Sequence, residues 1–110
     1  MAEPQAAPAG GTSDIAVYVV SYFEAMPTSI SEAAALLRQY RRASRAEAGQ
    51  VRLEVLQQRG RQNHFSVVEV WQDQQAFEAH VRAAHTRQFR ERFQPMTGSL
   101  YDERLYQALD

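Results

Sequence analysis

Four stretches of the chain carry the apolar pattern of β-strands. Residues 15–23 form a run of β-branched and aromatic side chains, long enough for a strand buried on both faces. Residues 51–57 alternate apolar and polar positions, and residues 64–71 are again β-type, with a short glycine-containing turn between the two stretches. Residues 99–106 alternate in the same way. The pattern predicts four strands, of which the second and third form a hairpin.

Apolar residues recur at helical spacing in the two long segments between these strands. The first helix is predicted to begin at Ser29, which has the spacing of a capping box with Glu32, and to end at Gly49 in a left-handed conformation. After the third strand Asp73 is expected to cap a short helix, and a second short helix follows it. The order predicts an α+β, ferredoxin-like fold, a four-stranded antiparallel sheet with helices on one face.

The face of such a sheet that carries no helices must be buried against another surface if it is apolar. By period two, it would carry a set of large apolar side chains: Tyr18, Val20, Tyr22, Leu56, Val68, Val70, Leu100 and Tyr106. Together they are too large an apolar surface to leave in water. The sequence therefore predicts a symmetric homodimer in which two sheets stack on each other.

Composition narrows the range of partners. The chain has 110 residues, with 12 basic and 13 acidic side chains and a net charge of -1 at pH 7. Nucleic acid and anionic membranes are not expected to bind, because both require a basic excess. The absence of cysteine excludes disulfides, iron–sulfur clusters and thiol nucleophiles.

The first 14 residues differ in composition from the rest of the chain. Residues 1–14 hold two prolines and two glycines and bury too little apolar surface to repay their ordering. We expect them to form a flexible tail before a single domain over residues 15–110. The sequence has neither a membrane-length apolar run nor a signal segment at its start, so a cytoplasmic protein is expected.

One face of the third strand carries the candidate site. Period two places Phe65, Val67, Glu69 and Trp71 on that face, and Trp71 ends the strand just before the helix that carries His80. A Trp, a Glu and a His can therefore converge on one cavity. The simpler interpretations are that Trp71 is a core residue and that Glu69 forms an ion pair with one of the arginines.

His80 and His85 are the candidates for a general base, because the pKa of an unperturbed imidazole lies near 6.5. Their spacing of five residues does not fit a shared helical face, and only Glu69 is available as a further ligand, so no metal is expected. His64 lies beside the hairpin turn and is expected to be a solvated loop residue. There is no nucleophile elbow or glycine-rich phosphate loop.

The segment Val-Glu-Val-Trp-Gln-Asp-Gln-Gln-Ala-Phe-Glu-Ala-His from Val68 to His80, followed by His-Thr-Arg-Gln-Phe from His85, resembles the signature of the antibiotic biosynthesis monooxygenase family. The resemblance extends weakly over residues 15–109. It implies a dimeric α+β barrel. It also implies oxidation of a small aromatic substrate, quinol- or phenol-like, by dioxygen without metal, flavin or other cofactor.

Within that family the chain is most similar to the branch that acts on quinols, which shares Trp71, His80 and His85. The anthrone branch carries Asn and Tyr where this chain has Val67 and Phe77. The haem-degrading branch has an Asn on the first strand, a Trp at the position of His80 and an iron-binding His that are all missing here. The resemblance therefore implies a quinol substrate and no haem.

The candidate site residues fall into two groups. His80 is assigned as the general base with His85 in support, although their roles can be exchanged, and Glu69 is a further proton acceptor. The pattern also offers an aromatic pocket suited to a flat ligand, lined by Phe65, Val67, Trp71, Phe77 and Phe89. Two alternatives stay open, an isomerase of a phosphorylated autoinducer-type sugar and a dimer that binds a small aromatic without turnover.

Overall fold

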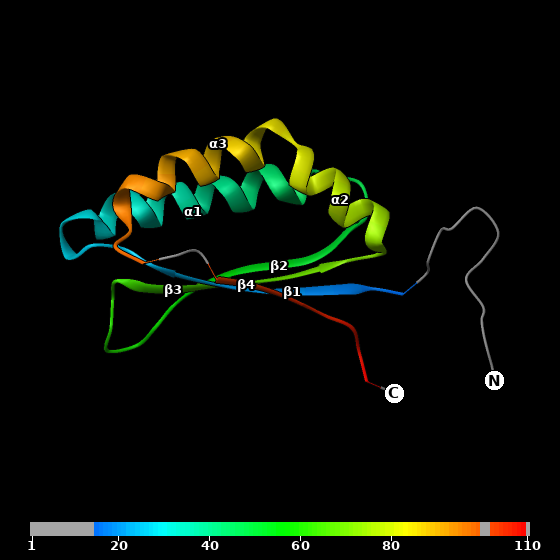
Figure 1. The fold of residues 1–110 in the computed structure, drawn as a ribbon, viewed down its shortest axis with the longest axis horizontal. Helices are drawn as coiled ribbons and strands as arrows, with labels where there is room; N and C mark the ends of the chain where they lie inside the picture. The colour runs from blue at the N-terminus through cyan, green and yellow to red at the C-terminus, as the bar shows by residue number, and fades with distance from the viewer. Residues whose placement is uncertain (1–14, 100–101, 110) are drawn as a thin grey trace.

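The computed structural model describes residues 15–99 and 102–109. The elements follow in the order β1 (Val17–Glu24), η3 (Pro27–Ser29), α1 (Ile30–Arg45), β2 (Gln50–Gln57), β3 (His64–Trp71), α2 (Gln74–Arg82), α3 (Ala84–Phe93), η4 (Gln94–Met96) and β4 (Asp102–Tyr106). The strands form one antiparallel sheet in the order β2-β3-β1-β4. All three α-helices lie on one face of it (Figure 1). The predicted ferredoxin-like α+β fold is confirmed.

The strands and helices differ from the prediction in three details. Buried positions alternate along β1, so the prediction of a strand buried on both faces is wrong for the described chain, whose helices cover only one face. The side chain of Ser29 makes no capping hydrogen bond, and a 3-10 turn precedes α1 instead. The helix ends at Arg45, so Gly49 lies in the turn that follows. The predicted tail lies outside the described residues.

Gly49 holds the turn between α1 and β2 against α2. Its backbone has a φ of 82°, in the left-handed region that favours glycine. A β-carbon at this position would lie 2.6 Å from the Cβ atom of Ala76 on α2. The carbonyl of Gly49 also accepts a hydrogen bond from the backbone of Gln72 at 2.8 Å. The turn is therefore fixed by conformation and by close packing.

We predict that Gly49→Ala lowers the free energy of unfolding by more than the cost of about 1–3 kcal/mol for a left-handed residue other than glycine, because the new methyl group also displaces Ala76. Gly60→Ala is the matched control, since Gly60 has a φ of 84° and open space around it. Urea denaturation of both variants measures the difference. Equal destabilisation would show that the turn does not depend on its contact with α2.

The face of the sheet away from the helices is apolar and open. The strand register places Tyr18, Val20, Val68, Val70 and Tyr106 on this face, as the sequence indicates, with Tyr22 and Leu56. Val70 is buried, but Tyr22, Leu56 and Tyr106 remain 51%, 47% and 48% exposed. Leu100 lies outside the described residues. The predicted homodimer would cover this surface.

We expect sedimentation at micromolar concentration to give twice the mass of the monomer, and the interface to bury well above about 1,200 Å². Tyr22→Arg should shift the equilibrium toward the monomer, because it places a charge on the apolar face that the second sheet would cover. Arg52→Ala, at the edge of the sheet on the same face, is the control. A folded wild-type monomer at this concentration would contradict the expectation.

Among the residues that the structure describes, no helix has the length and apolar character needed to cross a membrane.

Candidate active site

Two separate apolar clusters fill the space between the sheet and the helices. The larger one packs α1 and α3 on the sheet and contains Tyr40. The smaller one, near α2, contains Trp71. Two buried polar side chains, Glu69 and His80, each contact both Tyr40 and Trp71. They therefore lie where the two apolar clusters meet.

Glu69 is 1% exposed, and both of its carboxylate oxygens accept hydrogen bonds. The hydroxyl of Tyr40 donates to Oε2 at 2.6 Å, and the indole N–H of Trp71 donates to Oε1 at 2.8 Å. These bonds offset part of the cost of burying the carboxylate. The interpretation of Glu69 as the partner of an arginine is wrong. Trp71 is a core residue, with its indole N–H satisfied by Glu69.

His80 is also 1% exposed, and its ring stacks on Trp71 with 4.4 Å between ring centroids. Its Nε2 atom lies 2.8 Å from the Tyr40 oxygen and 3.6 Å from Oε1 of Glu69. Because the only hydroxyl proton of Tyr40 is donated to Glu69, the contact between His80 and Tyr40 requires a proton on Nε2. The hydrogen-bond network thus fixes which nitrogen of His80 donates to Tyr40.

The other ring nitrogen of His80 faces Glu47, in the turn after α1. Nδ1 lies 2.6 Å from Oε2 of Glu47, and Nε2 of His85 lies 2.9 Å from the same oxygen. Ala83 is extended and separates α2 from α3, so His80 and His85 belong to different helices. This break explains why a spacing of five residues brings both histidines to one carboxylate.

A continuous chain of hydrogen bonds therefore runs from the core to the surface. It starts at Glu69 and passes through Tyr40, His80 and Glu47 to His85. The side chains of Glu47 and His85 are 17% and 30% exposed, so the outer end of the chain reaches solvent. Each of these groups can accept or release a proton, and the arrangement can carry protons between the interior and water.

Two members of this chain were not among the predicted site residues. Tyr40 falls on the apolar stripe of α1, where its ring packs in the core and its hydroxyl has no sequence signature. Glu47 lies within the helix that the sequence predicts to end at Gly49. The early end of α1 at Arg45 frees Glu47 to turn toward α2. A carboxylate just before the glycine of a helix-ending turn is the one signal that could have indicated it.

The residues predicted to line an aromatic pocket are divided between the two apolar clusters. Phe65, Val67 and Phe89 belong to the larger cluster, whereas Trp71 and Phe77 belong to the smaller one. All five are buried, at 6% exposure or less. The structure brings Trp71 together with Glu69 and His80, as the sequence indicates, and Phe89 approaches this group through Tyr40.

One hollow lies beside the hydrogen-bonded chain, and a second lies near the C-terminal end of α3. The nearer one has a volume of about 170 Å³ and lies between α1 and α3, where Tyr40, His85 and Phe89 contribute to its lining. A larger hollow of about 420 Å³ is lined by Phe23, Phe93 and Arg90 among others. Phe89 packs on both Tyr40 and Phe23, with centroid distances of 4.5 and 5.6 Å. An aromatic layer thus separates the larger hollow from the chain.

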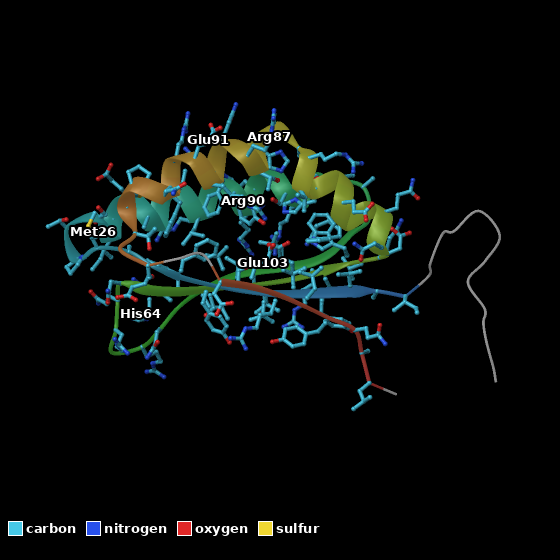
Figure 2. All side chains as sticks on the ribbon, viewed as in Figure 1. Met26, His64, Arg87, Arg90, Glu91 and Glu103 are labelled. Atoms are coloured by element: carbon cyan, nitrogen blue, oxygen red, sulfur yellow. The ribbon has the colours of Figure 1, made fainter. Side chains whose placement is uncertain are left out.

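Arg90 lies on the side of α3 that faces the sheet (Figure 2). It points toward the sheet and forms an ion pair with Glu103 of β4 at 3.2 Å, while Arg87 and Glu91 point away from the sheet (Figure 2). His64 lies at the far end of the sheet, beside the hairpin (Figure 2). It is the first residue of β3 and is half-buried, so the expectation of a solvated loop residue is wrong.

The sheet, the single helical layer and the buried chain of acid–base groups together define a small α+β protein. Residues 16–92 match the model of the family described as antibiotic biosynthesis monooxygenase. The chain belongs to this family. No curated protein sequence matches the chain.

Solved structures share the fold at low sequence identity. A Nitrosomonas europaea protein, described as a candidate antibiotic biosynthesis monooxygenase, has a TM-score of 0.82 at 18% identity, over 88% of this chain and 93% of that one. A Pseudomonas aeruginosa protein has a TM-score of 0.80 at 23% identity, over 87% of this chain and 96% of that one. A Mycobacterium tuberculosis protein has a TM-score of 0.81 at 20% identity, over 86% and 96%.

Proposed function

We propose that the protein is a monooxygenase that oxidises a small quinol or phenol with dioxygen and without a bound cofactor. The observation that carries the proposal is the unbroken chain of hydrogen bonds from Glu69 to His85, in a member of a monooxygenase family. Such a reaction begins with removal of a phenolic proton, and this chain supplies the groups that can take the proton and pass it to water.

The hollow beside Tyr40 and His85 is the proposed place of the substrate ring. Its volume of about 170 Å³ is close to that of a cavity of ~150 Å³ that binds one benzene ring. Phe89 supplies an aromatic wall, and Tyr40 and His85 are the members of the hydrogen-bonded chain that line the hollow. A substrate with one ring fits this space better than a three-ring anthrone.

The atoms and electrons of the proposed reaction balance without an external reductant. Deprotonation gives a quinol anion, which transfers one electron to dioxygen, and the two radicals combine to form a carbon–oxygen bond. Loss of water then leaves one oxygen atom on the ring as a hydroxyquinone, and both electron pairs come from the quinol. The enzyme holds the ring and moves the proton. His80 and His85 are the acid–base groups, and Glu69 is a further proton acceptor at the inner end of the hydrogen-bonded chain.

Oxygen-electrode assays test the proposal with one-ring quinols, anthrones and sugar phosphates, after a thermal-shift screen of the same compounds. We expect stoichiometric oxygen uptake with a quinol, and its loss in His85→Ala but not in His64→Ala. Stabilisation and isomerisation of a sugar phosphate with no oxygen uptake would favour the isomerase instead. Stabilisation by quinols without oxygen uptake would indicate a binding protein.

A further inference from the structure

We propose that Glu47, His80 and His85 form a binding site for a divalent transition-metal cation of the zinc class. Each residue offers one ligand atom, and the three atoms lie within 4.8 Å of one another. The set consists of two imidazole nitrogens and one carboxylate oxygen, a combination that binds zinc and its neighbours in the first transition row. The proposal goes beyond the proposed function and does not depend on it.

The first argument comes from the contact between His80 and Glu47. The proton on Nε2 of His80 is fixed by Tyr40, so in a neutral ring Nδ1 carries a lone pair. That lone pair would face a carboxylate oxygen of Glu47 at 2.6 Å. Two lone pairs at this distance repel each other, and a positive particle between them is required. A proton meets this requirement, and so does a metal cation.

The second argument comes from the groups behind His80. A histidine that binds a metal through one nitrogen usually donates its other N–H to an oxygen, which orients the ring and raises its basicity. Here Nε2 lies 2.8 Å from the hydroxyl oxygen of Tyr40, which is in turn bound to Glu69. The ring is also held by stacking on Trp71. Nδ1 is therefore held against Glu47, and the hydroxyl oxygen of Thr86 lies 3.3 Å from the same nitrogen.

The third argument concerns the space for the ion. With metal–ligand distances of about 2.0–2.2 Å, neighbouring ligand atoms in such a site lie about 3–3.5 Å apart. Oε2 of Glu47 now lies 2.6 and 2.9 Å from the two imidazole nitrogens. Glu47 must therefore retreat by roughly half an ångström, and its position in a partly exposed turn allows this movement. His85, at 30% exposure, gives the ion access from solvent.

A bound cation would occupy the positions that protons take in the hydrogen-bonded chain. Both contacts of Glu47 with the histidines would be replaced by metal–ligand bonds, so the path from His80 to His85 would be closed. We therefore expect Zn²⁺ at saturating concentration to inhibit the proposed oxygenation.

The test uses the full chain, treated with a chelator and titrated with Zn²⁺ by calorimetry and with Co²⁺ by its d–d absorption. We expect a single saturable site, and its loss in both His85→Ala and Glu47→Ala. His64→Ala is the control, because His64 is the only other histidine of the chain. His85 and Glu47 are partly exposed, so these variants are expected to fold. Thermal melting checks that they do.

Tyr40→Phe tests the role of the group behind His80. It removes the oxygen that fixes the proton on Nε2 while leaving all three ligands in place. Loss of such a partner typically weakens metal binding about 10- to 100-fold.

The site is refuted if neither ion binds saturably, or if His85→Ala binds as tightly as the wild type. Either result leaves a proton as the particle between His80 and Glu47. Oxygen uptake is measured in a separate experiment, because it tests the proposed oxygenation and not the metal site. If Zn²⁺ binds as expected but raises oxygen uptake, the metal site stands and the proposed oxygenation without a cofactor fails.

Discussion

His80→Gln is expected to lower kcat for quinol oxygenation by about 10²- to 10⁴-fold, the usual contribution of a positioned acid–base group. An amide in place of the imidazole can still donate a hydrogen bond toward Tyr40, but it cannot carry a proton to Glu47. The variant should interrupt the chain from Glu69 to His85 at its centre. Steady-state oxygen uptake, with KM determined separately, measures the effect.

Glutamine is preferred to alanine for this experiment because His80 is buried between two carboxylates. Alanine would leave a cavity that faces Glu47 and Glu69 and would destabilise the fold as well as the reaction. His64→Gln is the matched control, since His64 lies at the far end of the sheet (Figure 2). Full turnover of His80→Gln, with turnover lost only in His85→Ala, would transfer the role of base to His85.

Trp71→Ala is expected to cost about 3–5 kcal/mol of unfolding free energy, the usual range for a large aromatic core residue. Trp71 is fully buried, stacks on His80 and donates a hydrogen bond to Glu69. A domain of this size is typically stable by about 5–15 kcal/mol, so the variant will be close to unfolding at 37 °C. Urea denaturation followed by circular dichroism measures the loss.

Trp71→Phe separates the two contributions. Phenylalanine keeps a ring against His80 but removes the N–H that satisfies Oε1 of Glu69, which should cost about 1–3 kcal/mol. The larger loss in the alanine variant then measures the packing of the ring. If Trp71→Phe is as stable as the wild type, the carboxylate of Glu69 does not depend on the indole.

The order of the elements and three of the five members of the hydrogen-bonded chain could be predicted from the sequence. Alternation of apolar side chains indicates the strands, and period two places Glu69 and Trp71 on one face of β3. The position of Trp71 just before α2 also predicts its approach to His80, which the structure contains. These are local properties, because each depends on residues a few positions apart.

The partners of the buried polar groups were decided only by the tertiary structure. Tyr40 is 29 positions from Glu69 and 40 from His80, and Glu47 is 33 positions from His80 and 38 from His85. No periodicity links residues at such separations. The partner of a buried carboxylate or imidazole is the polar group that packing brings within about 3 Å. The ends of α1 at Arg45 and of α2 at Arg82 made that choice here, because they bring His80 and His85 to the same carboxylate, that of Glu47.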